Sequence, residues 1–400
     1  MGLKDKLRGL LVLKGNIPAI ALSEVVSNTG WNMFDVIWQP YVLGLGATMS
    51  ILGSLNGAQT AIRSVLQLVM GRVSDCVGRK SLLVVSYIFI IIGIVFSISA
   101  KSWIYIVPTF IFFSLADSLW EPAFPPMISE SVEENERGTA FSLISITWFI
   151  PGFYAPVIAG YIAEKYGFKP VLSILLLTEF SAFVILSIFV VETLKNGKKL
   201  NLGLIRGSLK ELLRPRFGLS RFYAAVIIDR FAYAIGEGIF FGMLLKTFNF
   251  TLFQLGVLVN VVSISAASSQ IIFGKLVDRY GSRRFLVAAG IISSSAFVGY
   301  FLSRNFLGFL ISQVFRGFAI STWDPSVNSY LSNVVPDEER GRFFGDINCL
   351  KGLISFPAPI LGAFLYETYC FRAPILASLV LSFAVIPLFI SMKGCDASVN

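Results

Sequence analysis

The residues from Ser81 to Ala100 read SLLVVSYIFIIIGIVFSISA, a run without a charged side chain. An α-helix of about 20 apolar residues crosses the hydrocarbon core of a bilayer, so this run predicts a transmembrane helix. Similar charge-free runs occur at Gly138–Ala163, Phe285–Ser303 and Ala373–Met392. Hydrophobic residues make up 55% of the 400-residue chain and charged residues only 14%. Since no polar stretch is long enough for a separate soluble domain, we predict an all-α integral membrane protein.

Breaks at charges, Gly and Pro divide the chain into twelve predicted spans. We expect these helices near residues 17–43, 47–70, 81–100, 103–129, 139–163, 169–191, 219–246, 251–273, 285–303, 306–335, 343–366 and 371–392. The one sizeable linker, residues 193–218, is strongly basic. We therefore expect an N-terminal six-helix bundle in residues 1–192 and a C-terminal one in residues 219–400.

The distribution of Lys and Arg predicts the orientation. Most of the 33 basic residues lie in the loops and tails on the side that carries both termini and the linker. The other side carries only Lys101, Lys165, Lys169, Lys246, Arg304 and Arg372. By the positive-inside rule, we expect a multi-pass plasma-membrane protein with both termini cytoplasmic. This asymmetry also accounts for the net charge of +9 without a nucleic-acid partner.

The absence of His from the sequence excludes several kinds of chemistry. A His metal site, a Ser-His-Asp triad and a His proton relay all need imidazole, so proton chemistry must use carboxylates. The four cysteines are scattered, which predicts free thiols and no metal site. The sequence also has no phosphate-binding loop. We expect neither an enzyme nor an ATP-driven pump, and no cofactor other than a proton gradient.

An internal repeat relates the two halves of the chain. Gly71, Asp75 and Gly78 recur 203 residues later as Gly274, Asp278 and Gly281. The same offset relates the tripeptides at 120–122 and 323–325 and joins Pro156 to Pro359. A parallel duplication of this kind is a transporter architecture, with the substrate held between the halves.

Residues 71–80, GRVSDCVGRK, resemble the signature loop of the major facilitator superfamily, Gly-x-x-x-Asp-x-x-Gly-Arg-Lys/Arg, and residues 274–284 form a weaker copy. The resemblance implies two pseudo-symmetric six-helix bundles that work by alternating access. We expect Asp75 to cap or face a helix end and Arg79 to pair with a carboxylate. The predicted gate loops contain Gly71, Asp75, Gly78, Arg79, Lys80, Gly274, Asp278, Gly281 and Arg283.

The segment GFYAPVIAG, residues 152–160, is similar to the Gly-Pro-x-x-Gly-Gly element of proton-coupled drug antiporters in this superfamily. Residues 358–363 contain a related version. Small residues permit close helix contacts and Pro permits a bend. Plain helix packing is the alternative interpretation. The packing motif comprises Gly152, Pro156, Gly160, Pro359 and Gly362.

Nine acidic and four basic side chains fall within the predicted spans. A charge at mid-membrane costs about 3 kcal/mol, so these groups cannot face lipid. The resemblance implies that the first, fourth, seventh and tenth helices line the central pathway, and most of the acids lie on them. The predicted proton and substrate pathway consists of Glu24, Asp35, Arg63, Asp117, Glu121, Asp229, Arg230, Tyr233, Glu237, Arg316 and Asp324.

Three of these residues have a more specific interpretation. Asp35 and Glu237 lie deep in their helices and have no acidic equivalent in the repeat, so we expect them to bind protons or cations. Arg63 has two interpretations: a structural partner for an acid such as Asp35 or Asp117, which we favour, and a substrate ligand. Glu179 lies on a helix expected at the periphery and has no explanation from the sequence.

These features predict a secondary transporter that exports hydrophobic or cationic small molecules in exchange for protons. An acid-rich, aromatic-lined cavity would attract cations. The expected partners are a small-molecule substrate and the lipid bilayer, and the expected state is a monomer. The alternatives are a proton symporter that imports a sugar, amino acid or other nutrient, and a sensor that no longer transports.

Overall fold

The computed structural model describes residues 14–133, 136–194, 219–335 and 347–392. Within these ranges the regular elements are all helical. The predicted linker at 193–218 lies almost entirely outside the described residues.

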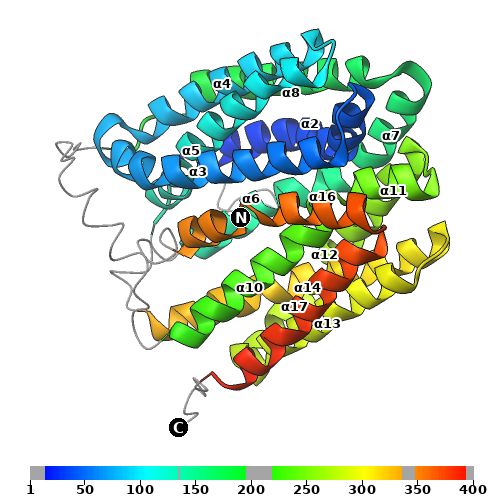
Figure 1. Cartoon of the computed structure of the whole chain (residues 1–400). Coiled ribbons are helices and arrows are strands. Elements are labelled where there is room, and N and C mark those ends of the chain that lie inside the picture. The colour runs from blue at the N-terminus through cyan, green and yellow to red at the C-terminus, as the bar shows by residue number, and fades with distance from the viewer. Residues whose placement is uncertain (1–13, 134–135, 195–218, 336–346, 393–400) are drawn as a thin grey trace.

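The N-terminal half contains six spans, which are coloured from blue to green in Figure 1. Its helices are α2 Ile17–Gly44, α3 Met49–Val77, α4 Arg79–Ser99, η1 Trp103–Ile106 followed by α5 Val107–Glu130, α6 Arg137–Gly152, α7 Ala155–Tyr166 and α8 Phe168–Phe189. Thr48 caps α3 because its hydroxyl accepts a hydrogen bond from the Ile51 backbone N–H at 3.2 Å. The α6 and α7 helices together form one span that is interrupted at residues 153–154.

The C-terminal half repeats this arrangement. Its helices are α10 Ser220–Glu237, α11 Phe240–Phe248, α12 Leu252–Tyr280, α13 Ser282–Leu302, α14 Phe306–Val334, a helical segment at 347–355, α16 Ala358–Thr368 and α17 Arg372–Ile390. Thr251 and Gln254 form a reciprocal capping box at the start of α12. The span that contains α16 is interrupted at residues 356–357.

The prolines of the predicted packing motif lie next to two of these interruptions. Pro156 and Pro359 each occupy the first turn of a helix that restarts after a break. A Pro has no backbone N–H, and its ring clashes with the carbonyl four residues earlier, so a continuous helix cannot pass through it without distortion. The structure therefore divides both spans where the sequence predicts a bend.

The twelve predicted spans are present. Nine helical spans in the described part of the chain are long and apolar enough to cross a membrane. The remaining three are α2, α3 and the interrupted α10–α11 span. All twelve fall close to the predicted ranges, although several helices extend further than their apolar segments.

The prediction that residues 71–80 and 274–284 form loops is wrong. The backbone of Gly71 and Asp75 belongs to α3, and that of Gly274 and Asp278 belongs to α12. The turns are made at Gly78 and Gly281, whose φ angles of 111° and 91° favour glycine. A hydropathy pattern marks only the part of a helix within the hydrocarbon core, so charged helix ends beyond it look like loops. The side-chain contacts predicted for Asp75 and Asp278 lie outside the described part of the structure.

The two halves lie against each other (Figure 1), with the α3–α16, α7–α12 and α2–α11 pairs in contact. We use "linker end" for the end of the molecule where α3, α5 and α8 finish and α10 begins. The opposite end, where α2, α4 and α7 finish, is called the "far end". The halves meet differently at these two ends.

Candidate functional site

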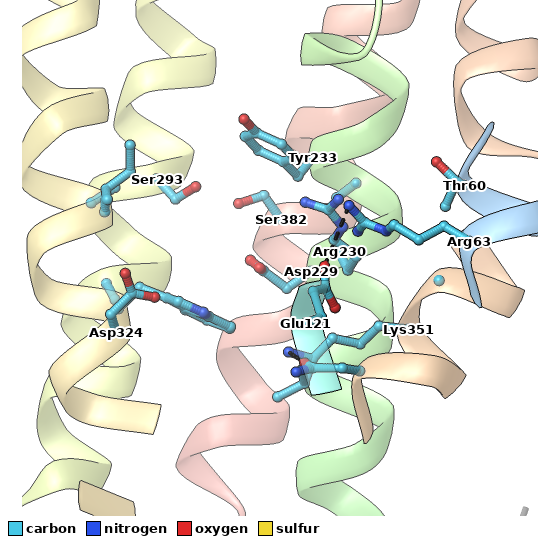
Figure 2. A pocket seen from close by; sticks show the side chains of 18 of the residues that line it. Thr60, Arg63, Glu121, Asp229, Arg230, Tyr233, Ser293, Asp324, Lys351 and Ser382 are labelled. Atoms are coloured by element: carbon cyan, nitrogen blue, oxygen red, sulfur yellow. Dashed lines mark hydrogen bonds and ion pairs between the residues drawn. The ribbon is translucent and has the colours of Figure 1, made fainter. Parts of the chain in front are cut away.

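A cavity of about 620 Å³ lies between the halves and takes its lining from both. The α3 and α5 helices contribute from the N-terminal half, and five helical segments contribute from the C-terminal half. Figure 2 shows polar and charged side chains projecting into it. A volume of this size falls within the range of about 300 to 1,000 Å³ that is usual for small-molecule sites.

Seven of the predicted pathway residues line this cavity. They are Arg63, Glu121, Asp229, Arg230, Tyr233, Arg316 and Asp324. The structure adds Lys351 and four aromatic residues to the lining. None of them was assigned to the site from the sequence; the aromatic residues are Trp120, Phe124, Phe297 and Trp323. Lys351 could have been found from the sequence because it is one of the few basic residues within the spans.

The charges lining the cavity are balanced rather than predominantly acidic. Four basic side chains line it, those of Arg63, Arg230, Arg316 and Lys351. Three acidic side chains accompany them, those of Glu121, Asp229 and Asp324. The expected acid-rich cavity is therefore not what the structure contains, because the other buried acids point elsewhere.

On the N-terminal side, Arg63 pairs with two acids of α5. Its Nη1 atom lies 3.6 Å from Asp117 Oδ2 and 3.6 Å from Glu121 Oε1. Gln67, one helical turn further along α3, donates a hydrogen bond to Glu121. Since residues four apart share a helix face, one face of α3 meets one face of α5. The predicted pairing of Arg63 with Asp117 is present, whereas Asp117 itself does not line the cavity.

On the C-terminal side, Arg316 pairs with Glu237. Arg316 Nε lies 2.6 Å from Glu237 Oε1, and the two side chains are 13% and 14% exposed. The contact is an ion pair without a hydrogen bond. Neither Arg316 Nε nor Glu237 Oε1 has a hydrogen-bond partner of good geometry among the described residues. The Arg316 guanidinium also lies 4.3 Å from the centre of the Tyr233 ring, a cation–π arrangement. Glu237 therefore pairs with Arg316 in this conformer and does not line the cavity. That it binds protons or cations stays a prediction.

Four charged groups of the cavity have no ion-pair partner among the described residues. They are Asp229, Arg230, Asp324 and Lys351. Arg316, Arg230 and Lys351 attract Asp229 at longer range, and Lys351 Nζ donates to Asn348 Oδ1 at 3.2 Å. Figure 2 shows Asp324 across the cavity from Arg230 and Lys351. Both an acidic and a basic wall are thus available to a bound molecule.

The predicted pathway residues of α2 are not part of this cavity. Neither Glu24 nor Asp35 lines it, although the side chain of Asp35 is exposed. The α2 helix packs against α8, α6 and α7, and these contacts set which of its faces turns toward each neighbour. A helical repeat in the sequence identifies residues on one face, but it does not say what that face meets.

At the linker end, Arg79 makes the ion pair expected of it. Its Nη2 lies 3.4 Å from Glu130 Oε1, and its Nη1 donates to Ser74 Oγ at 2.6 Å. In the second copy, Arg283 donates to the Ile390 carbonyl at the end of α17, where a helix carries negative partial charge. The two copies therefore hold their arginines differently.

Glu192, which no sequence pattern marks as a site residue, caps α4. Its carboxylate accepts hydrogen bonds from the backbone N–H groups of Arg79 at 2.9 Å and Lys80 at 3.0 Å. Two further N–H groups, of Thr193 and Leu194, also donate to it. Partial burial raises the pKa of Glu192, but these four hydrogen bonds outweigh it and hold the pKa below its ordinary value. No local pattern reveals this contact, because the cap is supplied from the end of another helix.

The packing motif lies at the interface between the halves. A Cβ atom at Gly160 would lie 2.3 Å from the Leu252 carbonyl oxygen, so α7 approaches α12 closely because Gly160 lacks one. Asn260 of α12 donates to the carbonyls of Gly152 at 3.0 Å and Phe153 at 2.6 Å. The break between α6 and α7 is thus held by the opposite half.

Hydrogen bonds also join the halves at the far end. The Gly242 N–H donates to Gln39 Oε1 at 2.9 Å, and Asn56 Nδ2 donates to the Gly238 carbonyl at 2.9 Å. Ser50 N–H donates to Glu367 Oε1 at 3.0 Å. Most of the described hydrogen bonds between the halves lie from mid-helix to the far end, whereas the cavity lies from mid-helix toward the linker end. One of them lies beside the cavity, where Cys349 Sγ donates to the Ser64 carbonyl at 3.3 Å.

Comparison with known proteins agrees with this architecture. The family model described as Major Facilitator Superfamily matches residues 20–241 and 227–394. The protein named Multidrug resistance protein MdtG from Salmonella arizonae is 24% identical over 368 residues, covering 90% of this chain and 91% of its own. The protein of the same name from Salmonella typhi has the same identity and coverage.

Solved structures with the same fold are more distant in sequence. The human organic anion transporter MFSD10 (TETRAN) superposes with a TM-score of 0.68 at 13% identity, covering 93% of this chain and 98% of its own. A POT family transporter in complex with 5-aminolevulinic acid gives a TM-score of 0.75 at 10% identity and covers 94% of both chains. At these identities the likeness shows the fold alone.

Proposed function

The chain belongs to the Major Facilitator Superfamily, and on this premise we propose that it exports hydrophobic or cationic small molecules in exchange for protons. The observation that carries the proposal is the cavity between the halves, where aromatic rings lie beside acidic groups that have no ion-pair partner among the described residues. The multidrug resistance proteins that are similar over nine-tenths of the chain support export as the direction.

Alternating access follows from the way in which the halves meet. In this conformer the described hydrogen bonds between the halves reach the far end, and the cavity lies on their linker side. Release of the substrate at the far end requires these hydrogen bonds to break while new contacts between the halves close the linker end. Each contact is a neutral or singly charged hydrogen bond worth about 0.5 to 3 kcal/mol, which a transport cycle can exchange.

Residues from both halves are proposed to hold the substrate in the cavity. Trp120, Phe124 and Trp323 offer apolar and π surfaces to a planar or lipophilic molecule. Asp324 is exposed within the cavity and offers an acceptor for a cationic group. We chose ethidium as the probe because it is planar, lipophilic and cationic.

The test is ethidium efflux from proteoliposomes under an imposed proton gradient. We expect transport to stop when the gradient is collapsed, and Asp324→Asn to raise the half-saturating ethidium concentration roughly tenfold through loss of a charged contact. The control is Glu133→Gln, which removes an exposed carboxylate away from the cavity. Efflux that persists without the gradient refutes the exchange, and gradient-driven accumulation of a polar nutrient instead supports the importer alternative.

A second candidate substrate class carries an acidic group. The observation that favours it is the pair of cavity cations, Arg230 and Lys351, that have no ion-pair partner among the described residues. Thermal stabilisation of the purified protein separates the two classes. A lipophilic anion that stabilises the wild type and not Lys351→Gln indicates this second class, whereas stabilisation by ethidium alone indicates the first.

The protein is proposed to work as a monomer in the plasma membrane, with both termini cytoplasmic, without a cofactor and without enzymatic or nucleic-acid-binding activity. Cys370 provides a test of the orientation because it is an exposed free thiol at the far end. A membrane-impermeant maleimide applied to intact cells is expected to label it, and Cys370→Ser to abolish that labelling. Labelling of Cys370 only in inverted vesicles contradicts the orientation.

A further inference from the structure

A second group of acids lies inside the N-terminal half, outside the cavity. Glu179 sits at the middle of α8 with none of its surface exposed. It is eleven residues from the start of that helix and ten from its end, or about 15 Å from each. Glu24 lies on α2 one helical turn before Ser27, which hydrogen-bonds to Glu179, and the two carboxyls interact electrostatically. Neither residue lines the cavity.

The hydrogen bonding of Glu179 is incomplete. Ser27 Oγ donates to Glu179 Oε1 at 2.7 Å. The other oxygen, Oε2, is buried and has no hydrogen-bond partner among the described residues. A buried carboxylate with an unpaired oxygen is strongly disfavoured, because nothing replaces the water that it has lost. A proton on this oxygen removes the charge, so the observed contacts fit a carboxylic acid.

No cation compensates the pair within the described part of the chain. The helices that pack on α8 are α2, α4 and α7. Their titratable groups are Glu24, Asp35, Tyr41, Arg79, Lys80, Tyr87, Tyr161, Glu164, Lys165 and Tyr166. Of these, only Glu24 and Tyr87 interact with Glu179. Arg79 pairs with Glu130 at the linker end, and Lys165 lies at the far end beside Tyr161.

The pair is connected to the rest of the molecule by polar groups on α2. Glu24 is only partly buried. One turn further, Asn28 Nδ2 donates to Thr147 of α6 at 3.3 Å, and Asn32 Nδ2 donates to the Asn28 carbonyl at 2.8 Å. The same helix ends near Gln39, which bonds to α11 in the other half. The α2 helix therefore touches both the acid pair and the contacts that close the far end.

We propose that Glu179 and Glu24 form a proton-binding site of the N-terminal half, separate from the cavity, in which Glu179 carries the proton in this conformer. The proton is released from the Glu179 carboxyl to water by way of the partly exposed Glu24 carboxylate and rebinds by the same route. Release leaves two carboxylates that repel each other across α2 and α8. A shift of α2 then changes the Gln39 contact, which makes the site a coupling device. This coupling role rests on the proton exchange proposed above, whereas the proton site itself does not.

Infrared spectroscopy of the purified full-length protein in detergent tests the proton site without any ligand. A protonated buried carboxyl has a C=O stretch that is distinct from that of a carboxylate. We expect this band in the wild type, a reversible pH titration of it within the folded range, and its loss in Glu179→Gln. Because interacting acids titrate in coupled steps, Glu24→Gln is expected to convert a broad two-step titration into a single step. Glu133→Gln, which removes an exposed carboxylate, should change neither.

Three results overturn the proposal. They are the absence of a protonated-carboxyl band, a band that does not change with pH while the protein stays folded, and a band that survives Glu179→Gln. If Glu179→Gln does not fold, the wild-type titration and its change in Glu24→Gln decide the question. A titrating band together with gradient-independent ethidium efflux refutes the exchange mechanism and leaves the proton site standing.

Discussion

At the scale of single residues, the Arg316–Glu237 pair is a buried charged contact of the C-terminal half. Both side chains are largely buried, and their charges lie 2.6 Å apart. The Tyr233 ring covers the guanidinium at 4.3 Å. Removing one member of a buried pair leaves the other charge without compensation, which costs more than the pair itself contributes. The Arg63–Asp117 pair is different, since both side chains are 34% exposed and 3.6 Å apart.

These two pairs predict different effects on stability. We expect Glu237→Gln to lower the free energy of unfolding by about 3 to 5 kcal/mol. Asp117→Asn is the matched control and should change it by only about 0 to 1 kcal/mol, because the exposed pair is screened by solvent. Unfolding of the purified variants in detergent measures both values. Equal losses in the two variants contradict the assignment of Glu237 to a structural pair.

At the scale of elements, the start of α4 depends on Glu192, a residue of the segment that follows α8. Gly78 makes the turn from α3 with a φ of 111°, and Glu192 then accepts hydrogen bonds from the first N–H groups of α4. A carboxylate at a helix N-terminus also interacts favourably with the helix dipole. The signature segment is therefore stabilised partly by a residue more than a hundred positions away.

The Glu192 cap predicts a pH-dependent stability. Its pKa is lowered from an ordinary value of 4.5 on folding, so its contribution is fully present above about pH 4.5 and is lost as the pH falls through the lower folded value. We expect Glu192→Gln to cost about 0.5 to 1 kcal/mol at neutral pH, the lower part of the range for caps, because the group is mostly exposed.

Unfolding of wild type and Glu192→Gln across the acidic range measures this effect. The difference between them should shrink as the pH falls below 4.5. A difference that stays constant down to the acid-unfolding transition shows that the carboxylate charge is not what stabilises the helix start.

At the scale of the whole molecule, glycines let the halves close together at the far end. Gly160 of α7 lies against the backbone of α12, and Gly53 of α3 lies against the backbone and side chains of α16. Ala363, which Gly53 meets, has no exposed surface in this conformer. Any side chain larger than hydrogen at Gly160 must push the two halves apart.

We therefore expect Gly160→Val to shift the population away from the conformer described here. The measurement is maleimide labelling of Ala363→Cys in a background without the native cysteines. Labelling should be slow alone and at least several-fold faster with Gly160→Val. Val157→Ala, a change on the same helix that adds no bulk, is the matched control. Unchanged labelling with Gly160→Val contradicts the role given to this close contact.

Several properties of the molecule follow from the sequence itself. Apolar runs such as Ser81–Ala100 determine the spans, because in lipid each helix must satisfy its own backbone hydrogen bonds. The repeat and the segment at 71–80 predict the family, which the family model confirms. The pairing of Arg63 with Asp117 was also accessible, since residues four apart on two neighbouring helices share a face.

Only the tertiary structure decided which of the other charged groups meet. It places Glu237 against Arg316, Lys351 in the cavity, and Glu179 beside Ser27 of α2. It also leaves Asp35 and Glu24 outside the cavity that they were expected to line. The reason is physical: a helical period fixes the relative positions of side chains on one helix, whereas the rotation of that helix toward its neighbours depends on packing contacts between residues distant in the chain.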